Sequence, residues 1–188
     1  MEHKRLFISI PIDPSLAKGL LRHVENLNIP LQNLRLVKAE NMHINLKFLG
    51  DTTLDKLDDI IKTVTEVCRN FGGLSLEINQ TKIFPVTEDQ KRPARILNVS
   101  FKYNEKLQEL YDKIEDALWQ AGLAHKETRR FTPHVTMARV KKSTAISEFK
   151  DFIDLPVSGD LPIDYVELQE SILEKTGPSY FVLSTFDL

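Results

Sequence analysis

The chain has 188 residues, of which 41% are hydrophobic and 28% are charged, and its formal net charge is −2. This length predicts one domain over residues 1–188, formed as a single unit or as two similar lobes, with room for an ordinary core. A net charge so close to zero excludes a polybasic protein that holds nucleic acid by bulk electrostatics, and no apolar run approaches the ~20 residues of a membrane span.

The first half of the chain predicts strands alternating with two helices. Asp13 and Pro14 make a strong helix start, because aspartate caps the first turn and proline fits its first position. Thr52 or Thr53 begins a second helix, which a glycine pair ends. The expected strands cover residues 6–10, 34–37 and 42–50, with a turn at 38–41.

The second half adds one long helix and several strands. An apolar stripe over residues 105–121 predicts the helix, and Gly122 ends it. Few helices and short connections predict an α+β protein with mainly antiparallel sheets backed by helices on one side. The remaining expected elements are strands at 74–84, 95–101, 132–139, 163–168 and 180–186, a hairpin loop at 86–93, a short helix at 145–152 and a turn at Gly177 and Pro178.

One short pattern occurs twice, once in each half of the chain. Residues 43–46 read HINL and residues 134–137 read HVTM. Alternate residues of a strand share a face, so each histidine is expected beside Asn45 or Thr136, with the apolar residues on the other face. The repeat predicts two lobes related by a pseudo-twofold axis, with the two motif strands facing each other across a cleft.

Two histidines in one cleft suit acid–base catalysis, because one accepts a proton from a nucleophile while the other protonates a leaving group. Histidine does either near neutral pH, since its pKa is ordinarily about 6.5. Asn45 and Thr136 offer hydrogen-bond donors to a phosphate oxygen. Lys47 and Arg139 follow them and add positive charge. These residues predict a metal-free acid–base enzyme that acts on a phosphate.

Each of these features also has a plainer interpretation. A single His-x-Thr on a strand is usually a hydrogen-bonded histidine without chemical function, and the basic segment 126–142 can be a solvated loop rather than an anion site. Zinc would need three or four ligands, and the chain has no CxxC, no HExxH and no second close ligand in either motif. Cys68, the single cysteine, lies on a helical apolar stripe, where a buried thiol is expected; it fits a reducing cytosol.

The two motifs resemble those of the 2H phosphoesterases, and among them the RNA 2′,3′-cyclic phosphodiesterases once called 2′–5′ RNA ligases. The family signature is a pair of His-x-Thr/Ser-x elements, here HINLKFLG from residue 43 and PHVTMAR from residue 133. The opening strand at 5–10, the hairpin around Phe84, the RFTP segment before the second motif and the GPSY segment near the end are collinear with the family. The likeness covers nearly the whole chain, with one departure: Asn45 stands where threonine or serine is usual.

The resemblance implies a bilobal fold in which two mainly antiparallel sheets line a central cleft and helices pack outside. It also implies that the chain hydrolyses a terminal ribose 2′,3′-cyclic phosphate to a 2′-phosphate, with no cofactor and no metal. His134 would be the general base that activates water, and His43 the general acid that protonates the departing 3′ oxygen. Asn45 and Thr136 would bind the phosphate.

The resemblance further implies that Phe48 and Arg139 contact the terminal base, on which an aromatic ring and a guanidinium can each stack. Strict strand alternation opposes both roles. It sets Arg139 on the face away from His134, so the role requires a bulge or the end of the strand. Alternation likewise sets Phe48 on the face away from His43, where it can equally be a core residue.

The resemblance leaves other functions open. One alternative is another 2H activity, on 2′–5′ oligoadenylate or a small cyclic phosphate; another is non-catalytic binding of RNA ends, which Asn45 brings into consideration. Reversal of the reaction would join RNA ends weakly through a 2′–5′ bond. The expected partner is RNA ending in a 2′,3′-cyclic phosphate, such as tRNA fragments, and His125 is a further RNA contact or a solvated loop residue. We expect a cytoplasmic monomer with no membrane segment.

Overall fold

The computed structural model describes residues 2–174 and 177–188. These residues form nine strands and three α-helices, in an order that follows the predicted alternation. The helices are α1 (Pro14–Glu25), α2 (Leu57–Cys68) and α3 (Glu105–Gln120). The strands are β1 (His3–Pro11), β2 (Leu34–Leu36), β3 (His43–Thr53), β4 (Leu74–Phe84), β5 (Ile96–Phe101), β6 (His134–Val140), β7 (Asp160–Ile163), β8 (Tyr165–Glu174) and β9 (Gly177–Asp187).

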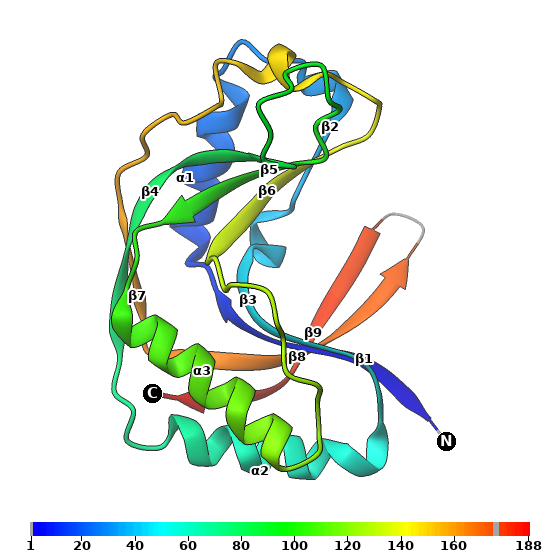
Figure 1. The fold of residues 1–188 in the computed structure, drawn as a ribbon, viewed down its shortest axis with the longest axis vertical. Coiled ribbons are helices and arrows are strands. Elements are labelled where there is room, and N and C mark those ends of the chain that lie inside the picture. The colour runs from blue at the N-terminus through cyan, green and yellow to red at the C-terminus, as the bar shows by residue number, and fades with distance from the viewer. Residues whose placement is uncertain (1, 175–176) are drawn as a thin grey trace.

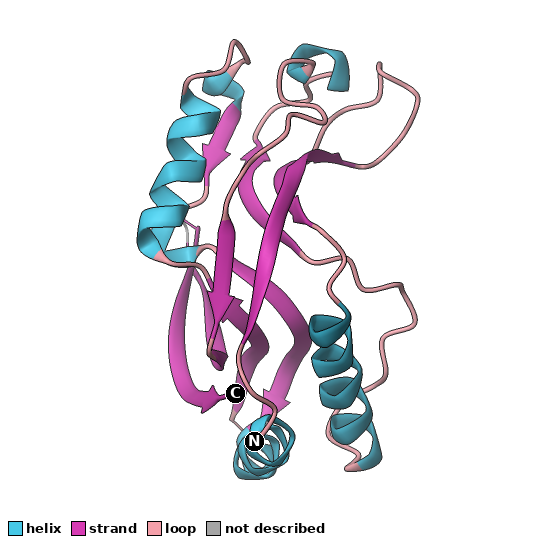
Figure 2. Cartoon of the chain, turned by 90° about the vertical axis from the view of Figure 1, so that its left-hand side faces the viewer, coloured by secondary structure: helices cyan, strands magenta, loops and turns pink. Residues whose placement is uncertain are grey.

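The strands pair antiparallel in the order β7-β4-β5-β6-β3-β1-β8-β9, and β2 pairs with β6. The two halves of this sheet meet at one central pair, Ile44 of β3 opposite Val135 of β6. From there the halves curl apart, with β4, β5 and β6 on one side and β1, β8 and β9 on the other (Figures 1 and 2). The expected α+β fold, with antiparallel halves and helices packed outside, is confirmed.

One side of the sheet carries the core. Helix α1 begins where predicted, because Asp13 Oδ1 accepts hydrogen bonds from the backbone nitrogens of Ser15 at 2.8 Å and Leu16 at 3.0 Å. Buried residues of α1, α2 and α3 join those of the strands in one hydrophobic cluster. Cys68 belongs to this cluster, and burial raises the pKa of its thiol to about 12, so it is the buried residue expected. No helix in the described ranges is long and apolar enough to cross a membrane.

Several expected boundaries differ from the structure. Strand β3 continues beyond Gly50, because this glycine adopts a φ of +72° and turns the strand while its pairing with β1 persists. The expected helix at 145–152 is only a 3₁₀ turn, Ile146–Phe149. The expected strand at 163–168 is divided between β7 and β8, which pair with different neighbours. Gly177 and Pro178, expected as a turn, belong to β9, and the two residues between β8 and β9 lie outside the described part.

Candidate active site

The central pair of the sheet also brings the two motifs together. Its register sets His43 opposite Thr136 and Asn45 opposite His134. All four side chains lie on one side of the sheet, since the central pair is fully buried on the other. We call the side that carries them the open face. Diagonal neighbours such as the two histidines have α-carbons roughly 7–8 Å apart, which leaves room for a small group between the rings.

The motif strands are therefore neighbours in one sheet. The prediction that they face each other across a cleft is wrong, because they pair directly. An antiparallel pair has a local twofold axis through its centre. Here that axis exchanges His43 with His134 and Asn45 with Thr136. The symmetry predicted from the repeat holds locally, at the point where the two halves join.

Both histidines are oriented by the same kind of backbone contact. The Nδ1 atom of His43 lies 2.9 Å from the carbonyl oxygen of Asn41, and that of His134 lies 2.9 Å from the carbonyl oxygen of Thr132. A carbonyl only accepts, so each Nδ1 carries the hydrogen and each Nε2 is left to take or give a proton. Asn41 is itself anchored, because its side-chain amide donates to the carbonyl of Pro178 on β9 at 3.3 Å.

A bulge in β3 brings Phe48 onto the open face. The register with β1 shifts between Asn45 and Lys47, so that Leu46 and Lys47 are both buried. Phe48 then lies directly opposite Phe7, and its side chain is 50% exposed. The bulge removes the difficulty posed by alternation, and the interpretation of Phe48 as a core residue is wrong.

A second bulge does the same for Arg139 in β6. The register with β5 shifts between Thr136 and Ala138, and Met137 and Ala138 are both buried. Arg139 therefore shares the open face with Thr136, as the predicted contact requires. Because Phe48 and Arg139 hold equivalent places after the two histidines, the bulges extend the local symmetry of the site.

Lys47 is buried and does not face the histidines. Its Nζ donates to Glu115 of α3 at 2.7 Å and to the carbonyl oxygen of His125 at 2.6 Å. The two charged side chains are only 6% and 3% exposed. The expectation that Lys47 offers charge to a phosphate is wrong, because the bulge turns it into the core. Glu115 also accepts from the backbone nitrogen of Glu127 at 3.0 Å, so the ion pair ties β3 to the loop that leads into β6.

Two aromatic residues that the sequence did not suggest surround His43. The ring centroid of Phe7 lies 5.0 Å from that of His43, and the centroid of Tyr180 lies 5.3 Å from it. Phe7 comes from β1 and Tyr180 from β9, so strands from both ends of the chain enclose the imidazole. Alternation places Phe7 away from the core residues Leu6 and Ile8, but nothing local in the sequence relates Tyr180 to His43.

The enclosure lowers the pKa of His43. Burial is the largest cause of a pKa below its ordinary value of 6.5. The hydrogen bond to the Asn41 carbonyl opposes this, and the charges of Arg139 and His134 lower the pKa further. The two histidines thus differ in setting, since the imidazole of His134 is exposed.

Two cations of the basic segment before the second motif are paired with neighbouring carboxylates. Lys126 pairs with Asp116, and Arg129 pairs with Glu127 at 2.6 Å, which favours the interpretation of a solvated loop for these two residues. The rings of Tyr111 and Phe131 stack at 4.1 Å and hold the loop against α3.

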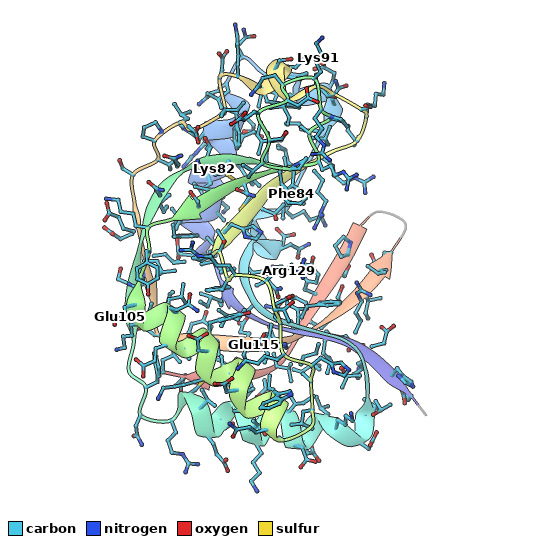
Figure 3. The ribbon with its side chains drawn as sticks, viewed as in Figure 1. Lys82, Phe84, Lys91, Glu105, Glu115 and Arg129 are labelled. Carbon is cyan, nitrogen blue, oxygen red and sulfur yellow. The ribbon has the colours of Figure 1, made fainter. Side chains whose placement is uncertain are left out.

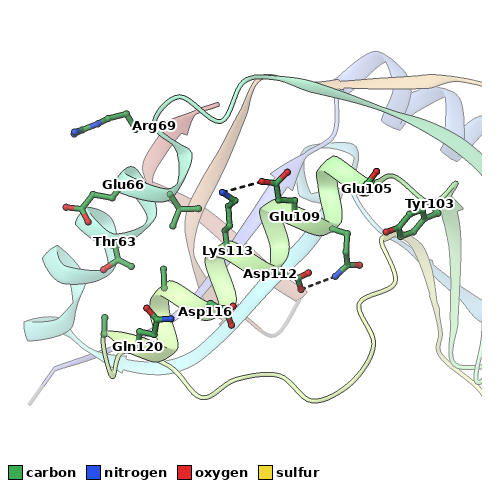
Figure 4. Close-up of a pocket in the computed structure, with 14 residues that line it drawn as sticks. Thr63, Glu66, Arg69, Tyr103, Glu105, Glu109, Asp112, Lys113, Asp116 and Gln120 are labelled. Carbon is green, nitrogen blue, oxygen red and sulfur yellow. Dashed lines mark hydrogen bonds and ion pairs between the residues drawn. The ribbon is translucent and has the colours of Figure 1, made fainter.

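A pocket between α2 and α3 lies apart from the histidines (Figure 4). Acidic side chains predominate in its lining, which makes it unsuited to a phosphate. In the part of the chain that is described, no group of three or more His, Cys, Asp or Glu side chains is placed to hold a metal ion. The charged residues of the pocket are Glu66, Arg69, Glu105, Glu109, Asp112, Lys113 and Asp116.

Known proteins are similar to this chain in sequence and in fold. A family model described as the 2′-5′ RNA ligase superfamily matches residues 14–170. The RNA 2′,3′-cyclic phosphodiesterase of Methanocaldococcus jannaschii is 28% identical over 185 residues, which cover 95% of this chain and 98% of that protein. TT0787 of Thermus thermophilus superimposes with a TM-score of 0.82 at 21% identity, covering 98% of this chain and 97% of its own. LigT of E. coli, in complex with 3′-AMP, gives a TM-score of 0.77 at 20% identity over 100% of this chain and 99% of its own.

Proposed function

Because this chain belongs to the 2′-5′ RNA ligase superfamily, we propose that it hydrolyses the 2′,3′-cyclic phosphate at an RNA end to a 2′-phosphate. The name of the relative from Methanocaldococcus jannaschii supports this substrate. The observation that carries the mechanism is the symmetric pair His43 and His134, each with Nδ1 bound to a carbonyl and Nε2 left for proton transfer. Residues 1–188 act in this proposal as one domain of two lobes, each of which supplies one histidine.

The two histidines divide the proton transfers. The Nε2 of His134 accepts a proton from water, whose oxygen attacks the phosphorus. The bond between phosphorus and the 3′ oxygen breaks, and Nε2–H of His43 gives its proton to that oxygen. The phosphate stays on the 2′ oxygen, and exchange with solvent returns the proton from His134 to His43. A positioned acid or base of this kind typically contributes ~10²–10⁴-fold to the rate.

The remaining open-face residues bind the RNA end. Asn45 and Thr136 donate to the phosphate oxygens between the histidines. Phe48 and Arg139 contact the terminal base. Phe48 is already covered on one side by the guanidinium of Arg5, whose Cζ lies 4.7 Å from the ring centroid, so a base stacks on its other side or displaces Arg5.

The proposal is tested by a hydrolysis assay on a short RNA that ends in a 2′,3′-cyclic phosphate, with EDTA present. We expect turnover that EDTA does not reduce, with a 2′-phosphate as product. A 3′-phosphate would mean that the other ester bond breaks and would contradict the role given to His43. Activity that EDTA abolishes and zinc restores would contradict the metal-free mechanism.

The lowered pKa of His43 predicts the pH dependence. As the general acid, His43 must hold a proton, so kcat/KM should decline as pH rises through a pKa that lies below 6.5. Replacing Tyr180 by alanine re-exposes the ring and moves its pKa back toward the ordinary value. We therefore expect the alkaline decline of Tyr180→Ala to occur at higher pH than that of the wild type. A pH–rate profile of both proteins on the same RNA checks this, and identical profiles would contradict it.

Asn45 favours one alternative, a protein that binds cyclic-phosphate ends without turning them over. An amide is bulkier than a hydroxyl and places its donors differently, so the phosphate can be held away from the histidines. Binding without hydrolysis, combined with hydrolysis by Asn45→Thr, would identify this alternative. A substrate panel with 2′–5′ oligoadenylate and small cyclic phosphates distinguishes the other 2H activities.

The cellular setting is part of the proposal. A buried, unreactive Cys68 is compatible with a monomer that works in the reducing cytoplasm on RNA ends such as tRNA fragments. Attack by a 5′-hydroxyl in place of water would give weak 2′–5′ joining of RNA ends.

A further inference from the structure

Two arginines face each other on the open face, beyond the histidines. The pairing of β2 with β6 sets Arg35 directly opposite Arg139, so both side chains point to the same side of the sheet. Both are exposed. Among the described residues, neither has a carboxylate oxygen within the 4.0 Å of an ion pair.

This arrangement favours an anion between the two guanidinium groups. Like charges directly opposite one another destabilise an antiparallel pair of strands. An anion held between Arg35 and Arg139 would remove the repulsion. A phosphate suits the position, because guanidinium groups donate paired hydrogen bonds to its oxygens.

An exposed aromatic ring lies on the same row of the sheet. Ile96 of β5 pairs with Arg139, and Phe84 of β4 pairs with Ile96, so Phe84 also lies on the open face. Its side chain is 49% exposed at the end of β4 (Figure 3). Exposed aromatic rings beside arginines are the usual means of holding single-stranded nucleic acid, because bases stack on the ring while the cations hold the backbone.

Arg35 and Phe84 lie too far from the histidines to serve the cyclic phosphate itself, whereas Arg139 is near enough for its charge to act on His43. The backbone of their row stands on the order of 15 Å from His134 along the direction of β6, at ~3.3 Å per residue. A second phosphate is required to reach it, and in an RNA chain that phosphate is the link to the preceding nucleotide. A mononucleotide has no such group.

We propose that Arg35, Arg139 and Phe84 form a subsite for the nucleotide that precedes the cyclic-phosphate end. Arg35 and Arg139 hold the phosphate that links the last two nucleotides, and the preceding base stacks on Phe84. Arg139 can contact the terminal base through its flat face and still donate to the phosphate in its plane. The inference rests on the proposed function and adds that the site selects an RNA chain over a single nucleotide.

The test compares chain lengths. The substrates are adenosine 2′,3′-cyclic phosphate and a di- and a tetranucleotide with the same end. We expect the wild type to have a higher kcat/KM on the two longer substrates. Arg35→Gln should lose about tenfold on these and change little on the mononucleotide, since a hydrogen bond to a charged group contributes about this factor. Phe84→Ala should show the same pattern.

Arg69→Gln is the matched control. It removes the same charge on the side of α2 and α3, away from the open face, and should keep the preference for longer substrates (Figure 4). Thermal unfolding of Arg35→Gln is a second, independent measurement. Removal of a repelling charge should leave the Tm of Arg35→Gln unchanged or raise it by about 1–3 °C, whereas loss of a structural contact would lower it.

Equal loss on all three substrates, or a wild type without length preference, would overturn the subsite while leaving the proposed function intact. If the wild type hydrolyses none of the three substrates, the proposed function fails. The subsite is then tested by measuring binding instead of hydrolysis. Fluorescence anisotropy with a labelled tetranucleotide ending in a cyclic phosphate should show weaker binding by Arg35→Gln. For Arg35→Gln, the slope of log Kd against log salt should be shallower than that of the wild type by about 0.7, the value for one phosphate contact on a single strand. Equal affinity and equal salt dependence would overturn the subsite.

Discussion

Replacement of His43 or His134 by alanine is expected to lower kcat on a cyclic-phosphate RNA by about 10²–10⁴-fold, the usual contribution of a positioned acid or base. Each imidazole has one nitrogen bound to a backbone carbonyl, so each variant removes the proton-transfer atom without taking a partner from another side chain. The double variant should be little slower than the slower single variant, because the two groups act in the same step.

The assay measures initial rates with EDTA present, and His3→Ala is the matched control because His3 is exposed at the start of β1. Circular dichroism should show native secondary structure in all variants. His43→Ala also removes a ring packed against both Phe7 and Tyr180, so its Tm should fall more than that of His134→Ala. A folded variant of either histidine with near wild-type kcat would contradict the acid–base mechanism.

Breaking the buried ion pair should have the largest effect on stability. Lys47→Met leaves the Glu115 carboxylate, only 3% exposed, without its cation. One oxygen of that carboxylate already has no hydrogen-bond partner in the described structure, so no other group is at hand to compensate. We expect the free energy of unfolding to fall by about 3–5 kcal/mol, as for other buried pairs that lose one member. For a chain of this size the Tm should drop by roughly 10 °C or more.

Urea and thermal unfolding measure this effect, and two further variants interpret it. Lys102→Met breaks a pair whose side chains are each 55% exposed, and it should change stability by no more than about 1 kcal/mol. The double variant Lys47→Met with Glu115→Leu removes the unpaired charge and should recover part of the loss. Recovery is partial because the carbonyl of His125 and the backbone nitrogen of Glu127 still lack their partners. A double variant as unstable as Lys47→Met alone would contradict this explanation.

The sequence by itself determined that three α-helices form and that each half of the chain carries one histidine motif. Helices α1 and α3 begin at Asp13 and Asn104, whose side chains cap the first turn, and their apolar stripes depend only on residues a few positions apart. The two histidine motifs are equally local, since each is a strand with one face apolar and the other polar. For that reason local rules found both His43 and His134, the phosphate-binding candidates beside them and the antiparallel α+β class.

Only the tertiary structure decided which other side chains join the histidines. The bulges that turn Phe48 and Arg139 onto the open face, and Lys47 into the core, arise from pairing with β1 and β5. Tyr180 reaches His43 from the last strand, and Arg35 reaches Arg139 from a strand only three residues long. Register is set by contacts between segments that are distant in the sequence, and a shift of one residue sends a side chain to the opposite face. The periodicity within one strand carries no information about that shift, so the composition of the open face follows from the assembled sheet.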